Sequence, residues 1–91
     1  MDIFLKLKYG NITTLDVHGK TLEDARADVL YMLSSLDYGV DGLLVIHGYH
    51  SGTKIRQWLR HEFVDDRVIK VVNADAGETL LLLTENLAKY Q

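Results

Sequence analysis

Residues 45–60 read VIHGYHSGTKIRQWLR, and this stretch decides the fold. An apolar run over 43–47 ends in a histidine–glycine pair, and a glycine-containing loop then leads into a basic, amphipathic segment. A short apolar run is typical of a strand that helices cover on at least one face. Glycines let the chain turn sharply from such a strand into a helix. The stretch therefore predicts a strand, a tight loop and a helix.

The same arrangement occurs upstream, where residues 14–21 read TLDVHGKT. We expect a strand over 12–17 that ends in the first histidine–glycine pair. Thr21 followed by Asp24 is typical of a helix start, and apolar residues then recur at helical spacing as far as Leu36. Two successive strand–helix units predict parallel strands joined by right-handed crossovers.

The N-terminal residues 3–9 alternate in a way that is typical of a half-buried strand. Gly10 and Asn11 offer a tight turn into the strand over 12–17. We therefore expect an N-terminal hairpin, with one extra strand in front of the first strand–helix unit.

The C-terminal half completes the predicted fold. Thr53 is the expected cap of a second, shorter helix in which Trp58 faces the core. Residues 68–72 and 79–83 are predicted to form an antiparallel hairpin around the turn sequence NADAGE. The fold class is thus α/β (α+β), a two-layer sandwich of order β-α-β-α-β-β with a mixed sheet, in one domain over 1–91.

Composition narrows the function classes. The chain has no cysteine, which excludes disulfides and cysteine-based zinc sites and fits a reducing cytoplasm. No apolar run approaches ~18 residues, so we expect no membrane partner. The net charge of −3 argues mildly against nonspecific nucleic-acid binding. However, residues 42–61 lack Asp and Glu but contain Lys54, Arg56 and Arg60, so this basic segment is either a phosphate-binding surface or a solvated helix face.

Three residues are candidate catalytic groups. Asp16 and His18 lie two apart on a predicted strand, so their side chains point to the same face, and His47 ends the neighbouring parallel strand. A carboxylate beside imidazoles is suited to acid–base chemistry near neutral pH. The structural alternative is that Asp16 caps a turn and the histidines fill strand ends. A divalent metal is the weaker alternative, since only one hard ligand is present, and we assign no cofactor.

The loop after the second strand is the candidate anion site. Backbone amides at a helix start bind phosphate, and the side chains beside them are basic. The predicted phosphate-binding residues are Gly48, Tyr49, His50, Ser51, Gly52, Thr53, Lys54, Arg56 and Arg60. A Walker loop is excluded because Thr53, not lysine, follows the second glycine. A backbone phosphate of a nucleic acid is therefore the better ligand, and Tyr49 is a candidate to stack on a base.

The segments LDVHGKTLEDA, VIHGYHSGTKIRQWLR and GETLLLL together resemble the Smr (small MutS-related) domain over residues 15–83. The resemblance implies a fold similar to the C-terminal domain of bacterial initiation factor three. It also implies nucleic-acid binding, with DNA nicking or RNA cleavage in several members. The positions that match the family's motifs are Asp16, His18, His47, Gly48, Gly52 and Arg56. The loop before Gly52 is one residue longer than the family pattern.

We therefore expect a nucleic-acid-binding domain with endonuclease activity on DNA or RNA. The alternatives are a non-catalytic RNA- or ribosome-binding module, which the net acidity and the longer loop favour, and a protein-interaction domain. With two imidazoles and one carboxylate available, metal-independent RNA cleavage is favoured. RNA supplies its own nucleophile in the 2′-hydroxyl, whereas duplex DNA requires an activated water, which usually needs a metal ion.

Overall fold

A four-stranded mixed sheet forms the centre of the chain, with its strands in the order β1-β2-β4-β3. The computed structural model describes residues 3–50 and 52–83. The elements are α1 (Ile3–Tyr9), β1 (Ile12–Asp16), α2 (Leu22–Ser35), β2 (Gly42–Ile46), α3 (Thr53–Gln57), the π-helical turn η1 (Trp58–Glu62), β3 (Val68–Asp75) and β4 (Glu78–Leu83). The predicted order β-α-β-α-β-β and the mixed sheet are confirmed.

Strand directions follow from the connections. β1 pairs with β2 in parallel across α2, with Asp16 beside Ile46. β4 pairs antiparallel with both β2 and β3, so it lies between them and β3 runs parallel to β2. Central strands are buried on both faces, which explains why β2 (GLLVI) and β4 (ETLLLL) are the most apolar strands.

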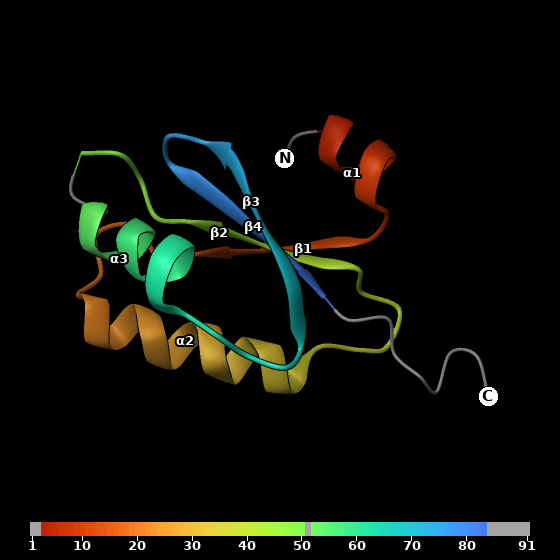
Figure 1. Cartoon of the computed structure of the whole chain (residues 1–91), viewed down its shortest axis with the longest axis horizontal. Coiled ribbons are helices and arrows are strands. Elements are labelled where there is room, and N and C mark those ends of the chain that lie inside the picture. The colour runs from red at the N-terminus through yellow and green to blue at the C-terminus, as the bar shows by residue number, and fades with distance from the viewer. Residues whose placement is uncertain (1–2, 51, 84–91) are drawn as a thin grey trace.

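One face of the sheet carries the main core, and α2 and α3 cover it (Figure 1). The predicted start of the long helix is confirmed, because the hydroxyl of Thr21 accepts a hydrogen bond from the backbone N–H of Asp24 at 3.1 Å. Trp58 is 7% exposed and belongs to the core, as expected. The buried residues of this core are Val17, Ala25, Val29, Leu33, Leu43, Val45, Ile55, Trp58, Leu59 and Leu81.

The opposite face corrects the prediction for the N-terminus. Residues 3–9 form the helix α1 rather than a strand, so the N-terminal hairpin is wrong. Leu5 and Tyr9 are four residues apart and therefore share one helix face, which packs on a small cluster that includes Leu44. The helix leaves the side chains of Ile3, Phe4 and Leu7 exposed.

The second helix also differs from the prediction at its start. Gly52, not Thr53, is the N-cap residue, and no side chain caps this end. The helix then widens into η1, where the backbone N–H of Phe63 donates to the carbonyl oxygen of Trp58 at 2.7 Å. This wider turn places Trp58 and Leu59 in the core and directs Arg60 toward β4.

Two further predictions concern the C-terminal part of the chain. The predicted turn NADAGE is shorter in the structure, because β3 continues through Asp75 and β4 begins at Glu78. The predicted tail, 84–91, lies outside the described residues. Among the helices that the structure describes, none is long and apolar enough to cross a membrane.

Candidate functional site

Both histidine–glycine pairs lie at the same end of the sheet, because β1 and β2 run in parallel. The chain leaves each strand through a glycine with positive φ, +78° at Gly19 and +77° at Gly48. The backbone N–H of Val17 continues the ladder by donating to the carbonyl oxygen of Ile46 at 2.8 Å. Side chains alternate along a strand, so Val17 and the residue after Ile46 both face the helices.

The structure brings Asp16 and His18 together. The Nδ1–H of His18 donates to Asp16 Oδ1 at 2.6 Å, and the backbone N–H of His18 donates to the same oxygen at 3.0 Å. These hydrogen bonds from His18 lower the pKa of Asp16, so its carboxylate is ionised at neutral pH. The side chain of His18 is 70% exposed. An ionised carboxylate can only accept, which assigns a proton to Nδ1 and leaves Nε2 as the ring nitrogen not bonded to Asp16.

His47 lies on the other face and is fully buried. Its Nδ1–H donates to the carbonyl oxygen of Gly48 at 2.9 Å, and its Nε2 accepts from the hydroxyl of Thr79 at 2.9 Å. Burial lowers the pKa of His47, and the nearby cations of Arg60 and Arg56 lower it further. The ring is therefore neutral, with both nitrogens bonded inside the protein, and the structure does not bring it to the Asp16–His18 pair.

Arg60 is half-buried and is bonded to the same group. Its Nε–H donates to the hydroxyl of Thr79 at 2.9 Å, and its Nη2 donates to the carbonyl oxygens of Asp75 at 2.7 Å and Glu78 at 3.0 Å. A continuous hydrogen-bonded chain thus runs from Arg60 through Thr79 to His47. Sequence reasoning missed Thr79, although a hydroxyl in the otherwise apolar run of β4 was a usable signal.

The loop between β2 and α3 is held from two sides. The backbone N–H groups of His47 and Gly48 both donate to the carbonyl oxygen of Gly77, at 2.9 and 3.0 Å. Gly52 packs against the backbone of His47, and a Cβ there would also lie 2.5 Å from the carbonyl oxygen of Gly48. Only glycine fits this close approach. The predicted phosphate-binding residue Ser51 lies outside the described residues.

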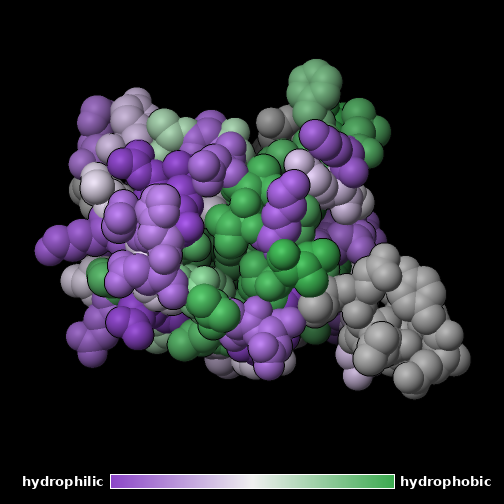
Figure 2. All heavy atoms as spheres, in the orientation of Figure 1, coloured by the Kyte–Doolittle hydropathy of each residue, from purple (hydrophilic) through white to green (hydrophobic). Residues whose placement is uncertain are grey.

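The remaining predicted phosphate-binding residues form an outer surface. Tyr49 and His50 are exposed, and their ring centroids are 4.3 Å apart. Thr53 and Lys54 are exposed at the start of α3, whereas Arg56 is half-buried and donates to the carbonyl oxygen of Ala76 at 3.4 Å. Figure 2 shows hydrophilic side chains gathered over the end of the molecule that carries α3, and hydrophobic ones over the sheet and α1.

In residues 3–50 and 52–83, no three His, Asp or Glu side chains come together in an arrangement that could hold an ion. Asp16 and His18 remain a pair of groups suited to moving a proton.

Comparison with known proteins agrees with this architecture. The chain matches the family model of the Smr domain over residues 15–79. It is also similar to the crystal structure of the Smr domain of Thermus thermophilus MutS2, at 28% sequence identity and a TM-score of 0.63, over 78% of this chain and 96% of that one. None of the curated proteins compared with the chain matches it. With the family model covering most of its length, the chain belongs to the Smr domain family.

Proposed function

We propose that this chain is a nucleic-acid-binding domain that cleaves phosphodiester bonds with the Asp16–His18 pair. The observation that carries the proposal is the 2.6 Å hydrogen bond between an ionised Asp16 and an exposed His18. It orients the imidazole and leaves Nε2 free to accept a proton from a bound substrate. Smr domains generally bind nucleic acid, which supports a polynucleotide as that substrate.

Phosphate binding is assigned to the outer surface at the start of α3. Lys54 forms no ion pair with the described residues, and Arg56 has a single long hydrogen bond to a backbone carbonyl. Both cations therefore have donors left for phosphate oxygens. Arg60 already donates to three oxygens of the protein, so we assign it to bracing the turn between β3 and β4.

RNA is the proposed substrate of the cleavage step. His18 Nε2 takes the proton of a 2′-hydroxyl, the 2′-oxygen forms a bond to the adjacent phosphorus, and the bond from phosphorus to the 5′-oxygen breaks. The leaving oxygen takes a proton from solvent, so the products are a cyclic phosphate and a 5′-hydroxyl. Asp16 stabilises the imidazolium while it exists. His47 is assigned a positioning role, because it holds the loop at Gly48 beside His18.

The test compares cleavage of matched RNA and DNA strands in excess chelator by the parent, Asp16→Asn and His18→Ala. We expect RNA cleavage in chelator and a loss of about 10²–10⁴-fold for His18→Ala. Activity that vanishes with chelator would contradict the metal-free step. Cleavage that survives both substitutions would come from a contaminating nuclease.

Binding is measured separately across a salt series with Lys54→Ala and Arg56→Ala. Each phosphate contact contributes ~0.7 to the log–log slope on a single strand and ~0.9 on a duplex. We expect the salt slope of each variant to fall by about the contribution of one phosphate contact. Binding without any cleavage would favour the non-catalytic RNA-binding module, and parental binding by both variants would show that the basic surface is only solvated.

A further inference from the structure

We infer that this site takes an unpaired nucleic-acid strand in preference to a duplex. The inference rests on the proposed function and specifies its substrate class. Two separate features near the Asp16–His18 pair carry it: an exposed aromatic pair, Tyr49 and His50, and a cavity between the starts of α2 and α3.

The aromatic pair follows a glycine that lies close to the catalytic histidine. Tyr49 is 60% exposed, and its ring is tilted by 43° against that of His50. The preceding residue, Gly48, lies close to His18, since a Cβ built on Gly48 would be 3.8 Å from the Cβ of His18. The ring of Tyr49 also rests against Gly77, where a Cβ would lie 3.5 Å from its Cδ1. An exposed ring supported by backbone in this way is a platform on which an unpaired base stacks.

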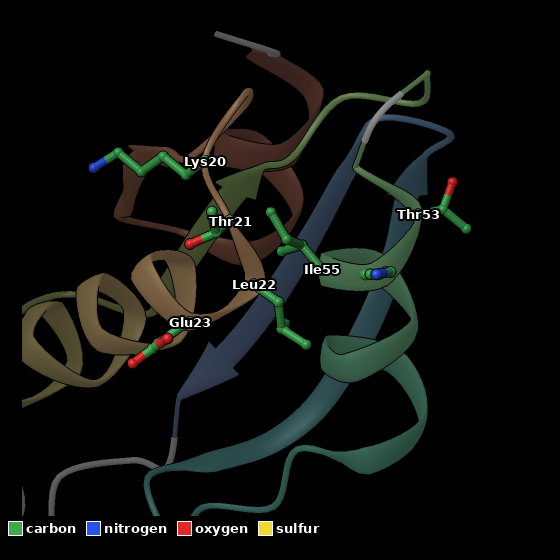
Figure 3. A pocket seen from close by; sticks show the side chains of 7 residues that line it. Lys20, Thr21, Leu22, Glu23, Thr53 and Ile55 are labelled. Carbon is green, nitrogen blue, oxygen red and sulfur yellow. The ribbon is translucent and has the colours of Figure 1, made fainter.

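The cavity has a volume of about 630 Å³, which is within the range of ligand-binding clefts. In Figure 3 the side chains of Leu22 and Ile55 lie in the gap between the two helix starts, whereas Lys20 and Thr53 extend outward. The floor is therefore apolar and the rim polar. The residues that line the cavity are Lys20, Thr21, Leu22, Glu23, Thr53, Lys54 and Ile55.

A nucleobase with its phosphate fits this combination. The flat, weakly polar base would occupy the gap beside Leu22, and the phosphate would lie at the rim near Lys54. Glu23 repels additional phosphates, which favours one nucleotide over a cluster of charges. Lys20 lines the cavity and follows His18 by two residues, so both belong to the segment that joins β1 to α2. That spacing suits a nucleotide close to the cleaved bond.

Both features require a base that is not paired. In a duplex the faces of the bases are stacked on their neighbours, and a base reaches a protein pocket only after unpairing and unstacking, which costs a few kcal/mol. A single strand, a loop or a bulge presents its bases without that cost. The geometry therefore favours strands or strand segments without a partner.

The first experiment measures the affinity of a short labelled RNA strand, alone and annealed to its complement, by fluorescence anisotropy at fixed salt. We expect the parent to bind the single strand at least about tenfold more tightly. Tyr49→Ala should lower single-strand affinity by about 5- to 100-fold, Tyr49→Phe should keep it because the ring remains, and duplex affinity should not change.

The second experiment places one abasic residue at successive positions of the same strand and needs no altered protein. We expect two positions at which the missing base weakens binding, one for the Tyr49 platform and one for the cavity. In Leu22→Trp, whose side chain fills the gap, the penalty at the cavity position should disappear. Circular dichroism checks that this variant is folded. If an abasic residue weakens binding to the parent equally at every position of the strand, that result alone contradicts the inference.

The outcomes separate the inference from the function on which it rests. If the parent binds duplex as well as single strand, with dependence on Lys54 and Arg56 in both cases, the proposed function stands and the preference for unpaired strands is overturned. If the parent binds neither form, the proposed function itself fails. Tight binding of a protein ligand in place of RNA would overturn both.

Discussion

The two histidine–glycine pairs are identical in sequence and similar in backbone, yet their histidines have different surroundings. His18 is 70% exposed and bonded to a carboxylate, whereas His47 is fully buried and bonded to a hydroxyl and a carbonyl. Both following glycines have φ close to +78°. The difference therefore does not come from the local turn.

Strand register explains the difference. Asp16 pairs with Ile46, so the residue opposite His47 is Val17 and not His18. His18 lies one position further along its strand. Because side chains alternate between the two faces, an offset of one residue sends one imidazole into the helix-covered core and the other to solvent. A short motif repeated in a sheet protein thus need not repeat its chemistry.

The largest expected effect on stability comes from removing the buried ring. His47→Ala leaves the hydroxyl proton of Thr79 without its acceptor and the carbonyl of Gly48 without the ring N–H. It also opens a cavity, so we expect a loss of about 2–4 kcal/mol of unfolding free energy. The matched variant His18→Ala should stay within about 0.5 kcal/mol of the parent. Urea denaturation measures both. Equal losses would mean that the two histidines have similar structural roles.

Replacing the glycines tests whether the turns are equivalent. Gly19→Ala and Gly48→Ala each place a side chain at positive φ, which costs about 1–2 kcal/mol. A Cβ at either position would meet no atom closer than 3.8 Å, so strain and not collision sets the cost. Thermal unfolding should therefore show similar losses for the two variants. A much larger loss at one of them would show that the turns differ in more than the histidine.

The smallest expected effect is the pH dependence of stability that His47 contributes. Burial lowers the pKa of His47 in the folded state below the ordinary value of 6.5, which the unfolded chain keeps. At a pH between the folded pKa and 6.5, therefore, only the unfolded chain binds the proton. Stability is then fully present above pH 6.5 and falls as the pH drops toward the folded pKa, by at most about 1.4 kcal/mol per pH unit. His47→Gln should flatten this slope. The lowered pKa of Asp16 affects stability only below the ordinary carboxyl value of 3.8.

Much of the fold was predictable from the sequence because apolar periodicity and helix caps are local signals. The strands, the long helix and the burial of Trp58 follow from such signals. Residues 3–9 were not predictable in the same way, since apolar residues two apart suit a strand while Leu5 and Tyr9, four apart, also suit a helix.

The candidate site was predictable only in part. Asp16 and His18 are two residues apart, so their contact needs no long-range information. The environment of His47 depends on the register of β1 on β2 and on Arg60 reaching Thr79 from a helix 19 residues away in sequence. No local sequence pattern specifies these tertiary contacts. For that reason Arg60 was predicted to bind phosphate, as a basic residue of the helix, and its hydrogen bonds within the protein were not foreseen.

The wide turn at Trp58–Glu62 makes the second helix sensitive to insertions and deletions. A π-helical turn holds one residue more than an α-helical turn over the same hydrogen-bonded span. Deleting a residue just before Arg60 would turn the hydrogen bond from Phe63 to Trp58 into an ordinary α-helical one and leave Phe63 in place. Arg60 lies inside the wide turn, so its side chain would move back by one position around the axis. The guanidinium would then leave Thr79 and the turn between β3 and β4. Length variation in this helix should therefore be tolerated less than changes of residue type on its outer surface.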